Sequence, residues 1–168
     1  MRRLVLAVTA AALTLGLVAG PVAAKTAKPG SIVDIAVAAA QANPGEFKTL
    51  VAAVLAADPA VVTTLSKQRQ LTVFAPTDAA FAKLGLDAGN IGTLPKATLT
   101  QILLYHVAPG ARDAADVTSS DRIRTLQRGF LDVTVNADGA FVNESKIVAV
   151  NIRASNGIIH AIDAVLLP

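Results

Sequence analysis

The sequence contains no cysteine and no tryptophan, and aromatic residues make up only 4% of its 168 residues. The absence of cysteine excludes a disulfide framework, a thiolate zinc site, an iron–sulfur centre and a cysteine nucleophile. One Tyr and five Phe provide no stacking platform of the kind that single-stranded nucleic acids require. Charged residues are also few, at 16%, whereas 53% of the residues are hydrophobic, which excludes a disordered chain. A chain of this length has room for one ordinary domain.

The N-terminal segment has the pattern of an export signal. The basic pair Arg2-Arg3 precedes a short apolar run over residues 4–19. The helix-breaking pair Gly20-Pro21 and the small side chains of Val22-Ala23-Ala24 follow. This order predicts a secretory signal peptide over residues 1–24, which is cleaved from the mature protein. The alternative is an uncleaved membrane anchor, but a spanning helix needs about 20 apolar residues and this run is shorter. We therefore expect a secreted protein, extracellular or periplasmic, with no membrane anchor after cleavage.

The formal net charge of +3 is concentrated near the N-terminus. Basic residues of the signal peptide and of a short tail over residues 25–30 account for it, at Arg2, Arg3, Lys25 and Lys28. In the expected domain, residues 31–168, acidic and basic residues nearly balance, so a general electrostatic attraction for nucleic acids is missing. We expect no nucleic-acid partner.

Helix signals dominate the first half of the expected domain. Ser31 with Asp34 three residues later forms a capping box, which predicts a helix to about residue 42. Asp58-Pro59 is typical of a helix start, with Asp as the cap and Pro in the first position. Between these two helices, apolar residues recur at helical spacing and predict one buried stripe, formed by Phe47, Leu50, Val51, Val54 and Leu55.

Two further helices are predicted around a short strand. The strand covers residues 71–75, and Thr77 then caps a brief helix that carries Phe81 and Leu84. The second helix begins at Pro95 and ends at Pro109-Gly110. Its apolar stripe contains Leu99, Ile102, Leu103, His106 and Val107.

From about residue 122 the periodicity changes from helical spacing to alternation. The strand around Leu131 alternates apolar and polar side chains, so one of its faces is expected to be buried and the other wet. Two later strands, over residues 147–152 and 157–166, are joined at Asn156-Gly157, a strong hairpin signal. Helices followed by antiparallel strands, without a change of composition, indicate a single α+β domain.

Three segments resemble the signatures of one known family, the fasciclin (FAS1) domains. Residues 71–81, LTVFAPTDAAF, resemble the first signature of that family. Residues 104–107, LYHV, followed by Pro109-Gly110, are similar to its tyrosine–histidine motif. Residues 156–163, NGIIHAID, resemble its closing signature. The three motifs occur in the order and spacing of the family and together cover about residues 31–168.

The resemblance to fasciclin domains implies an α+β fold in which an antiparallel β-wedge sheet carries a packed set of N-terminal helices. It also implies a secreted or surface module with a role in adhesion or matrix contact rather than catalysis. The partner would be a cell-surface or matrix protein or polysaccharide. Because one domain offers one copy of any weak site, avidity would require weak self-association or a multivalent partner. A purely structural component of the cell envelope would carry the same sequence features.

The alanine-rich composition and the compact signal favour a bacterial source.

Most residues of the three motifs have a structural explanation. Thr77 is a helix cap, and the phenylalanines of the first motif are core residues. Asn156-Gly157 is expected to supply the positive φ angles of a tight hairpin. Tyr105 lies off the helical stripe that holds His106, so its ring is expected at the rim of the core, with the hydroxyl bonded or hydrated. The motif residues with expected structural roles are Phe74, Pro76, Thr77, Asp78, Phe81, Asn156, Gly157, His160 and Asp163.

The two histidines allow two interpretations. His106 belongs to an apolar helix face and His160 shares a strand face with isoleucines, so each is expected to be buried with a hydrogen-bond partner. The alternative is a small metal-binding protein or hydrolase that uses His106, His160 and an aspartate. Asp163 is three residues from His160 on the same strand, which points the two to opposite faces. No His-Glu-x-x-His or Gly-x-Ser-x-Gly pattern occurs. We expect no catalytic residue, no cofactor and no bound metal.

Two candidate partner contacts come from the resemblance. Tyr105 and His106 match a segment that is proposed to be adhesive in the family, although a buried His106 would shape the surface rather than touch a partner. In animal members, integrin contact is tied to an acid followed by an aliphatic residue. The aligned pair here is Asn151-Ile152, which lacks the carboxylate that an integrin metal site needs. Binding to integrins in that mode is therefore not expected.

A third candidate contact is a basic cluster formed by Arg122, Arg124 and Arg128. Arg122 and Arg124 lie two residues apart and share one side of an extended segment. The simpler interpretation is a solvated strand face whose charge is relieved by Asp121. The alternative is a contact with an acidic polysaccharide.

Overall fold

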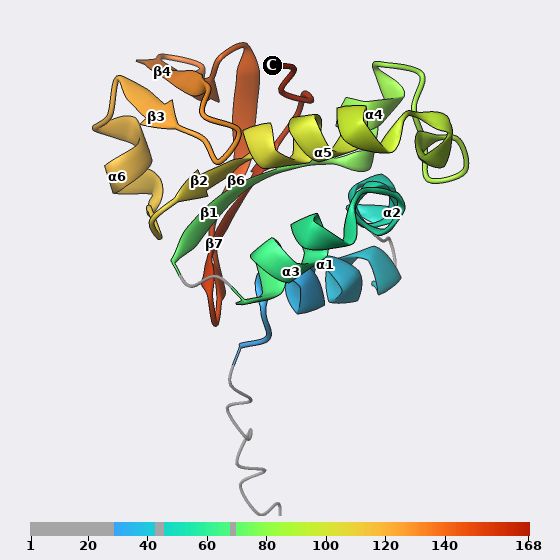
Figure 1. Cartoon of the computed structure of the whole chain (residues 1–168). Helices are drawn as coiled ribbons and strands as arrows, with labels where there is room; N and C mark the ends of the chain where they lie inside the picture. The colour runs from blue at the N-terminus through green and yellow to red at the C-terminus, as the bar shows by residue number, and fades with distance from the viewer. Residues whose placement is uncertain (1–28, 43–45, 68–69) are drawn as a thin grey trace, which may run out of the picture.

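The computed structural model describes residues 29–42, 46–67 and 70–168 (Figure 1). The predicted signal peptide, residues 1–24, lies outside the described residues. The helices are α1 (Ile32–Gln41), α2 (Lys48–Ala56), α3 (Pro59–Lys67), α4 (Asp78–Ala82), the 3₁₀ helix η1 (Ile91–Thr93), α5 (Lys96–Tyr105) and α6 (Ala114–Thr118). The strands are β1 (Leu71–Pro76), β2 (Val107–Pro109), β3 (Arg122–Arg124), β4 (Phe130–Asn136), β5 (Gly139–Val142), β6 (Ser145–Ala154) and β7 (Gly157–Ile162).

The strands of the described residues form one sheet in the order β2-β1-β7-β6-β5-β4-β3. The central strands β1 and β7 are parallel, with Val73 paired to Ile159, whereas the other neighbouring strands are antiparallel. The predicted α+β class is confirmed, and the sheet is antiparallel as predicted except for the parallel pair of β1 and β7. A hairpin forces two strands to be antiparallel, and β1 reaches β7 through a long connection instead.

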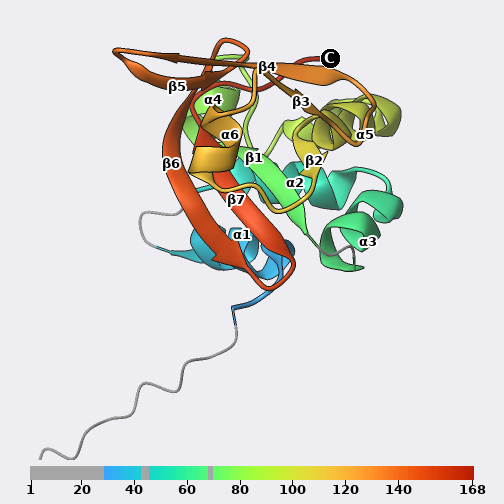
Figure 2. The same ribbon diagram turned by 90° about the vertical axis from the view of Figure 1, so that its left-hand side faces the viewer.

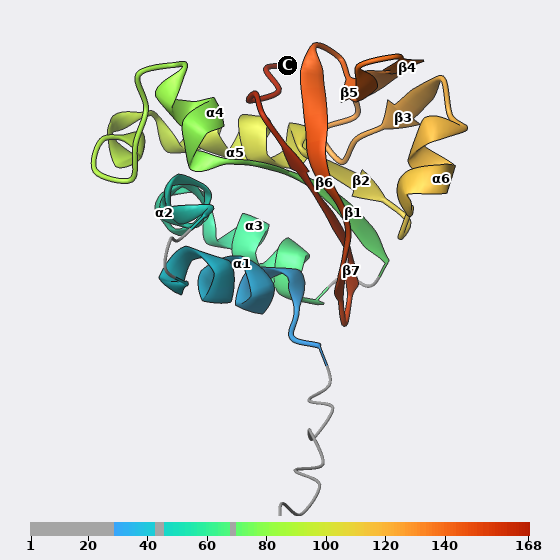
Figure 3. The ribbon, with the colours of Figure 1, turned by 180° about the vertical axis from the view of Figure 1, so that it is seen from behind.

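The central strands are buried along their whole length and separate two cores. On one face, Val73 and Ile159 pack beneath α1, α2, α3 and α5 in the first core. On the other face, Phe74 and Ile162 pack with Leu131 and the remaining strands in the second core. Figure 3 shows α1, α2 and α3 together on one side of β1 and β7, and Figure 2 shows β3, β4 and β5 at the opposite end of the sheet. Side chains of β7 therefore face either core, but not solvent.

The predicted helix starts are confirmed. The Ser31 side chain accepts a hydrogen bond from the backbone N–H of Asp34, and the Asp34 carboxylate accepts one from the backbone N–H of Ser31, which completes the capping box of α1. The Ser31 hydroxyl also lowers the pKa of Asp34, because it stabilises the charged carboxylate. Asp58 caps α3 and Thr77 caps α4. These are local interactions, which is why the sequence pattern predicts them well.

The second helix differs from its predicted stripe. Phe47 precedes α2 in a left-handed conformation, and Leu55 is 73% exposed, whereas Leu50 is buried as expected.

No single helix within the described ranges is both long and apolar enough to cross a bilayer. The pair Lys48–Ala56 and Pro59–Ser66 meets that criterion jointly by length and composition, with a bend of 119° between the two helices.

The helix that contains the tyrosine–histidine motif ends earlier than predicted. α5 stops at Tyr105, with His106 as its C-cap, and Val107 begins β2 instead of extending the apolar stripe. The reason is tertiary: Val107 pairs with Val73 of β1, and the His106 carbonyl accepts from Phe74. Strand pairing replaces the last helical turn, and it places the two motif residues at the junction of helix and sheet.

Candidate functional site

His106 lies at the junction of α5 and β2 and is 2% exposed. Its Nδ1 is 2.8 Å from the carbonyl oxygen of Ile102, and the backbone N–H of Leu166 donates to its Nε2 at 2.9 Å. A backbone N–H can only donate, so Nε2 is the acceptor and Nδ1 carries the proton. Burial lowers the pKa of His106 to about 4, an effect that the bond to Ile102 offsets only in part. The neutral ring therefore ties α5 to the C-terminal segment.

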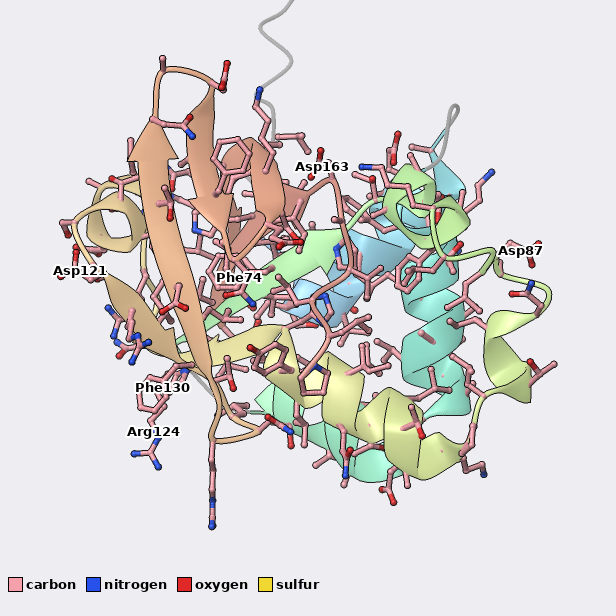
Figure 4. The ribbon with its side chains drawn as sticks, turned by 90° about the horizontal axis from the view of Figure 1, so that it is seen from above. Phe74, Asp87, Asp121, Arg124, Phe130 and Asp163 are labelled. Atoms are coloured by element: carbon pink, nitrogen blue, oxygen red, sulfur yellow. The ribbon has the colours of Figure 1, made fainter. Side chains whose placement is uncertain are left out.

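His160 of β7 is fully buried in the second core. Its Nε2 donates to the carbonyl oxygen of Arg112 at 3.0 Å, and its Nδ1 accepts from the backbone N–H of Asn151 at 3.4 Å. The ring also stacks on Phe74, with 5.8 Å between the ring centroids (Figure 4 labels Phe74 at the centre of the fold). Burial lowers the pKa of His160, opposed by the Arg112 carbonyl and by the charge of Asp113. This ring connects β7 to β6 and to the segment before α6.

Backbone groups therefore engage all four ring nitrogens of the two histidines. The expectation that each histidine is buried with a hydrogen-bond partner is confirmed. A shared metal ion would need a free lone pair from each ring, and those of His106 and His160 already accept backbone N–H groups. Across the described ranges, no three His, Asp or Glu side chains are grouped to hold a metal ion. The geometry favours a structural role for both rings.

Tyr105 is buried rather than at the rim, with 8% of its surface exposed. Its hydroxyl donates to the carbonyl oxygen of Phe130 at 2.9 Å and accepts from the side-chain amide of Asn143 at 3.4 Å. The ring lies beside Gly129, where an added Cβ would come within 2.6 Å of the tyrosine ring. The predicted bonded hydroxyl is confirmed, but the predicted rim position is wrong, because the turn between β3 and β4 covers the ring.

That turn, residues 125–129, is held onto the end of α5 by backbone hydrogen bonds. The N–H of Leu126 donates to the Val107 carbonyl at 2.7 Å, and that of Gln127 donates to the Leu104 carbonyl at 3.3 Å. Leu104 lies in the last turn of α5, where carbonyl groups need partners from outside the helix. The tyrosine of the motif thus serves as the support on which the β3–β4 hairpin rests.

Replacing Tyr105 with phenylalanine is expected to loosen this hairpin. The variant keeps the ring but leaves the Phe130 carbonyl without its hydroxyl donor, so the free energy of unfolding should fall by about 1 kcal/mol. Urea denaturation measures this loss, and hydrogen exchange at the Thr125 and Arg128 amides, which bond within the turn, should accelerate. Unchanged exchange at both amides would show that the hydroxyl does not hold the hairpin.

The closing signature anchors three segments, but not through the predicted backbone angles. Neither Asn156 nor Gly157 has a positive φ, so that prediction is wrong. The Asn156 side chain instead accepts from the backbone N–H of Ile32 at 2.8 Å and donates to the carbonyl oxygen of Leu65 at 2.5 Å. Its backbone carbonyl accepts from the N–H of Leu71. The asparagine thereby joins α1, α3 and β1 to the β6–β7 hairpin. Its side chain both accepts and donates in these contacts, which is why an amide is needed at this position.

The two motif aspartates also link distant segments. The carboxylate of Asp78 accepts from the first two N–H groups of α2, at 2.7 and 3.2 Å, and caps that helix where Phe47 offers no side-chain acceptor. Asp163 accepts from the Lys146 backbone at 2.8 Å, and the Lys83 ammonium lies 3.6 Å from its second oxygen. Since the Lys83 side chain is exposed and that of Asp163 is partly exposed, this ion pair contributes little, and the backbone bond is the main link.

The pair Asn151-Ile152 is largely committed to the fold. Asn151 sits at a bulge of β6 with a φ of 60°, and its side-chain oxygen accepts from the first N–H of α6, that of Ala114, at 2.8 Å. Ile152 is partly buried and packs against the first core. The asparagine therefore holds α6 against β6, and the isoleucine offers little surface to a partner.

The arginines of β3 lie on an outward-facing surface. Arg122 and Arg124 are exposed on either side of the buried Ile123, and they pair across the sheet with Asp132 and Phe130. We call the surface formed by Arg122, Arg124, Phe130 and Asp132 the arginine face. Figure 4 shows Arg124 and Phe130 extending from the same edge of the molecule.

The charges of this face are only partly neutralised. Arg122 forms an ion pair with Asp132, at 2.7 Å between Nε and Oδ1, and not with the predicted Asp121. Within the described part of the chain, Arg124 has no ion-pair partner. Phe130 beside it is 54% exposed, and sequence reasoning did not single it out. The sequence does indicate that Phe130 is exposed, because Phe130 occupies a position where the alternation of β4 places polar side chains.

The motif residues together define a class of protein. Buried histidine, tyrosine and asparagine side chains link segments that are distant in sequence around a mixed sheet, and the helices α1–α3 cover one of its sides. Such an arrangement describes a wedge-shaped α+β module. The family model of the Fasciclin domain matches residues 45–168, so the chain belongs to the fasciclin domain family.

Known proteins share this fold and parts of this sequence. The chain is 40% identical over 112 residues to Protein sll1483 of Synechocystis sp.. This alignment covers 64% of this chain and 61% of that protein. It is 35% identical over 99 residues to the immunogenic protein MPB70 of Mycobacterium bovis. That alignment covers 59% of this chain and 50% of MPB70. The chain thus spans less than two thirds of either relative's length.

A solved structure confirms the FAS1-type fold. The chain is similar to a FAS1 domain pair from the insect cell adhesion molecule Fasciclin I, with a TM-score of 0.55 and 15% sequence identity. The match covers 74% of this chain and 46% of that one. At this identity, the likeness concerns the fold and not the partner.

Proposed function

We propose that this chain is a non-catalytic binding module that is exported and contacts an acidic polysaccharide of a cell surface or matrix through the arginine face. The observation that carries the proposal is the pairing of Arg124, which has no ion-pair partner in the described residues, with the exposed ring of Phe130. The predicted signal peptide over residues 1–24 supports export. Membership of a family that includes a cell adhesion molecule supports the adhesive class.

The other candidate surfaces are less suited to a partner. Tyr105 and His106 are buried, and the side-chain oxygen of Asn151 already accepts a hydrogen bond from the first N–H group of α6. Tyr105 supports the exposed surface from behind, because its hydroxyl bonds to the carbonyl of Phe130, a member of the arginine face. This division of roles agrees with the hypothesis that the tyrosine–histidine motif shapes a surface rather than touching a partner.

The chemistry of the arginine face fits a polymer of uronic acids. A guanidinium group binds a carboxylate through two parallel hydrogen bonds, and an aromatic ring attracts the C–H groups on the apolar face of a sugar. Each such contact at an exposed surface is weak. A polymer that repeats the same group compensates through avidity, either along its own length or through weak self-association of the protein.

Retention on immobilised alginate, with neutral dextran as the comparison, tests this proposal. The purified protein should be retained on alginate at about 0.05 M salt and released near 0.5 M, because salt screens exposed charges. It should pass through dextran. The double variant Arg122→Ala/Arg124→Ala and the single variant Phe130→Ala should each bind about tenfold more weakly, which corresponds to about 1.4 kcal/mol.

The matched control is Arg153→Ala, which removes an exposed arginine from β6 and leaves the arginine face intact. Its retention should equal that of the unmodified protein. Equal weakening of this control would assign the contact to overall charge or to the β6–β7 hairpin instead. Failure of the unmodified protein to bind any acidic polymer at low salt would overturn the proposed ligand class.

A further inference from the structure

An apolar cavity of about 120 Å³ lies within the helical side of the molecule. Its walls are formed by α1, α2 and α3, by the first-core faces of β1 and β7, and by the end of α5. Figure 3 shows how these helices stand over β1 and β7. The arginine face lies on β3 and β4, at the other end of the sheet, so the cavity is separate from the proposed polysaccharide contact (Figure 1).

The lining of the cavity offers almost no polar group. Of the described residues that line it, His106 alone carries a polar side chain, and both of its ring nitrogens are bonded to the backbone. A buried water molecule needs two to four polar partners, so this space is unfavourable for water. An apolar void also leaves its lining atoms without dispersion contacts on one side. Apolar cavities of about 150 Å³ bind small hydrocarbons such as benzene for this reason.

Some lining residues of α1 and α2 are also accessible from the surface. Leu55, which is 73% exposed, belongs to its lining, as do the half-buried Val33 and Val37 of α1. Ile32 is the only residue of α1 that is fully buried. An exposed leucine that continues into an apolar cavity gives a hydrocarbon a dry route from the surface to the interior.

We propose that this cavity binds the end of a hydrocarbon chain of an amphiphile, whose polar headgroup remains in solvent beside Leu55. The described residues of the lining offer no free donor or acceptor and no charged side chain with which to hold a headgroup inside. The volume accommodates a chain end of about six carbon atoms, by comparison with cavities that take up benzene. Recognition is therefore by apolar contact and shape alone.

A titration with 1-decanol, an uncharged probe, tests this site. Methyl NMR spectra of the full chain should show saturable shifts with one-to-one stoichiometry at Ile32, Leu65, Leu103 and Ile159, which line the cavity from α1, α3, α5 and β7. Shifts confined to exposed methyl groups, or shifts that do not saturate, would overturn the proposal. Binding of benzene without binding of decanol would also overturn it, because it would show a closed void with no entry for a chain.

Two neighbouring alanines of α1 provide a matched pair of variants. Ala39 lines the cavity, whereas Ala38 is exposed on the same helix and does not. Ala39→Leu should fill part of the space and weaken decanol binding about tenfold or more, a change of about 1.4 kcal/mol. Ala38→Leu should bind as the unmodified protein does. If Ala39→Leu does not fold, Ala36→Leu, also in the lining, serves instead. Equal affinities in the filled and exposed variants would exclude this cavity as the site.

Discussion

Replacing Gly157 with alanine is expected to lower the free energy of unfolding by about 3 kcal/mol or more. A Cβ at this position would overlap the backbone carbonyl of Leu71 and come within 2.9 Å of the Ile32 side chain. Leu71 is the partner of Gly157 in the parallel pairing of β1 with β7, so neither strand can move away there without disrupting that pairing. The clash is with backbone, which cannot change rotamer to relieve it.

Urea denaturation of Gly157→Ala and of a matched control measures this effect. Gly92→Ala is the control, because a Cβ there would lie 3.9 Å from the nearest atom, the Cβ of Ala56, an ordinary contact. Its stability should stay within about 0.5 kcal/mol of the unmodified protein. If Gly157→Ala is as stable as the control, the close approach of β1 to β7 at this residue is incorrect.

Gly157 also shows what the sequence can and cannot predict. The Asn156-Gly157 pair correctly predicts the location of the β6–β7 hairpin, since hairpin signals are local. The physical reason differs, because the glycine is needed where Leu71 approaches and the asparagine where Ile32 and Leu65 do. Those partners are distant in the chain, and a single sequence does not show which distant segments meet.

The same distinction separates correct from incorrect element boundaries. The capping box of Ser31 with Asp34 involves neighbours within one turn, and the sequence predicts it in full. The end of α5 depends on the pairing of Val107 with Val73, which helical periodicity does not contain. The exposed Leu55 follows the same rule: its spacing is helical, but no element packs over it in the described structure. Periodicity identifies a face, and tertiary contacts decide how much of that face is covered.

The candidate site follows this pattern as well. The resemblance to the fasciclin family drew attention to Tyr105 and His106, whose contacts are internal. Phe130 carries no motif, yet its position on the polar side of β4 distinguishes it as an exposed aromatic residue. Family motifs therefore report the residues that hold the fold together, and departures from the alternating pattern indicate the surface that remains for a partner.

Acid is expected to destabilise the protein between pH 6.5 and pH 4 through His106. The unfolded chain binds a proton at this residue near pH 6.5, whereas the buried ring in the folded protein resists protonation until about pH 4. The unfolded state therefore binds more protons in this window, and stability falls as the pH falls. The contribution is complete above pH 6.5 and its loss reaches on the order of 3 kcal/mol near pH 4. His160 adds to the loss in the same direction, because burial lowers its pKa too.

Urea denaturation at several pH values between 7.5 and 4.5 measures the slope, in the variant His106→Leu as well as in the unmodified protein. The variant should be less stable at pH 7.5, because Leu166 and Ile102 lose their partners, but its stability should depend less on pH. Nitrogen-15 NMR of the imidazole gives an independent reading: His106 should remain the neutral tautomer with the proton on Nδ1 down to about pH 5. A folded-state titration of His106 near pH 6.5 would contradict its burial between α5 and the C-terminal segment, and with it the structural role assigned to the tyrosine–histidine motif.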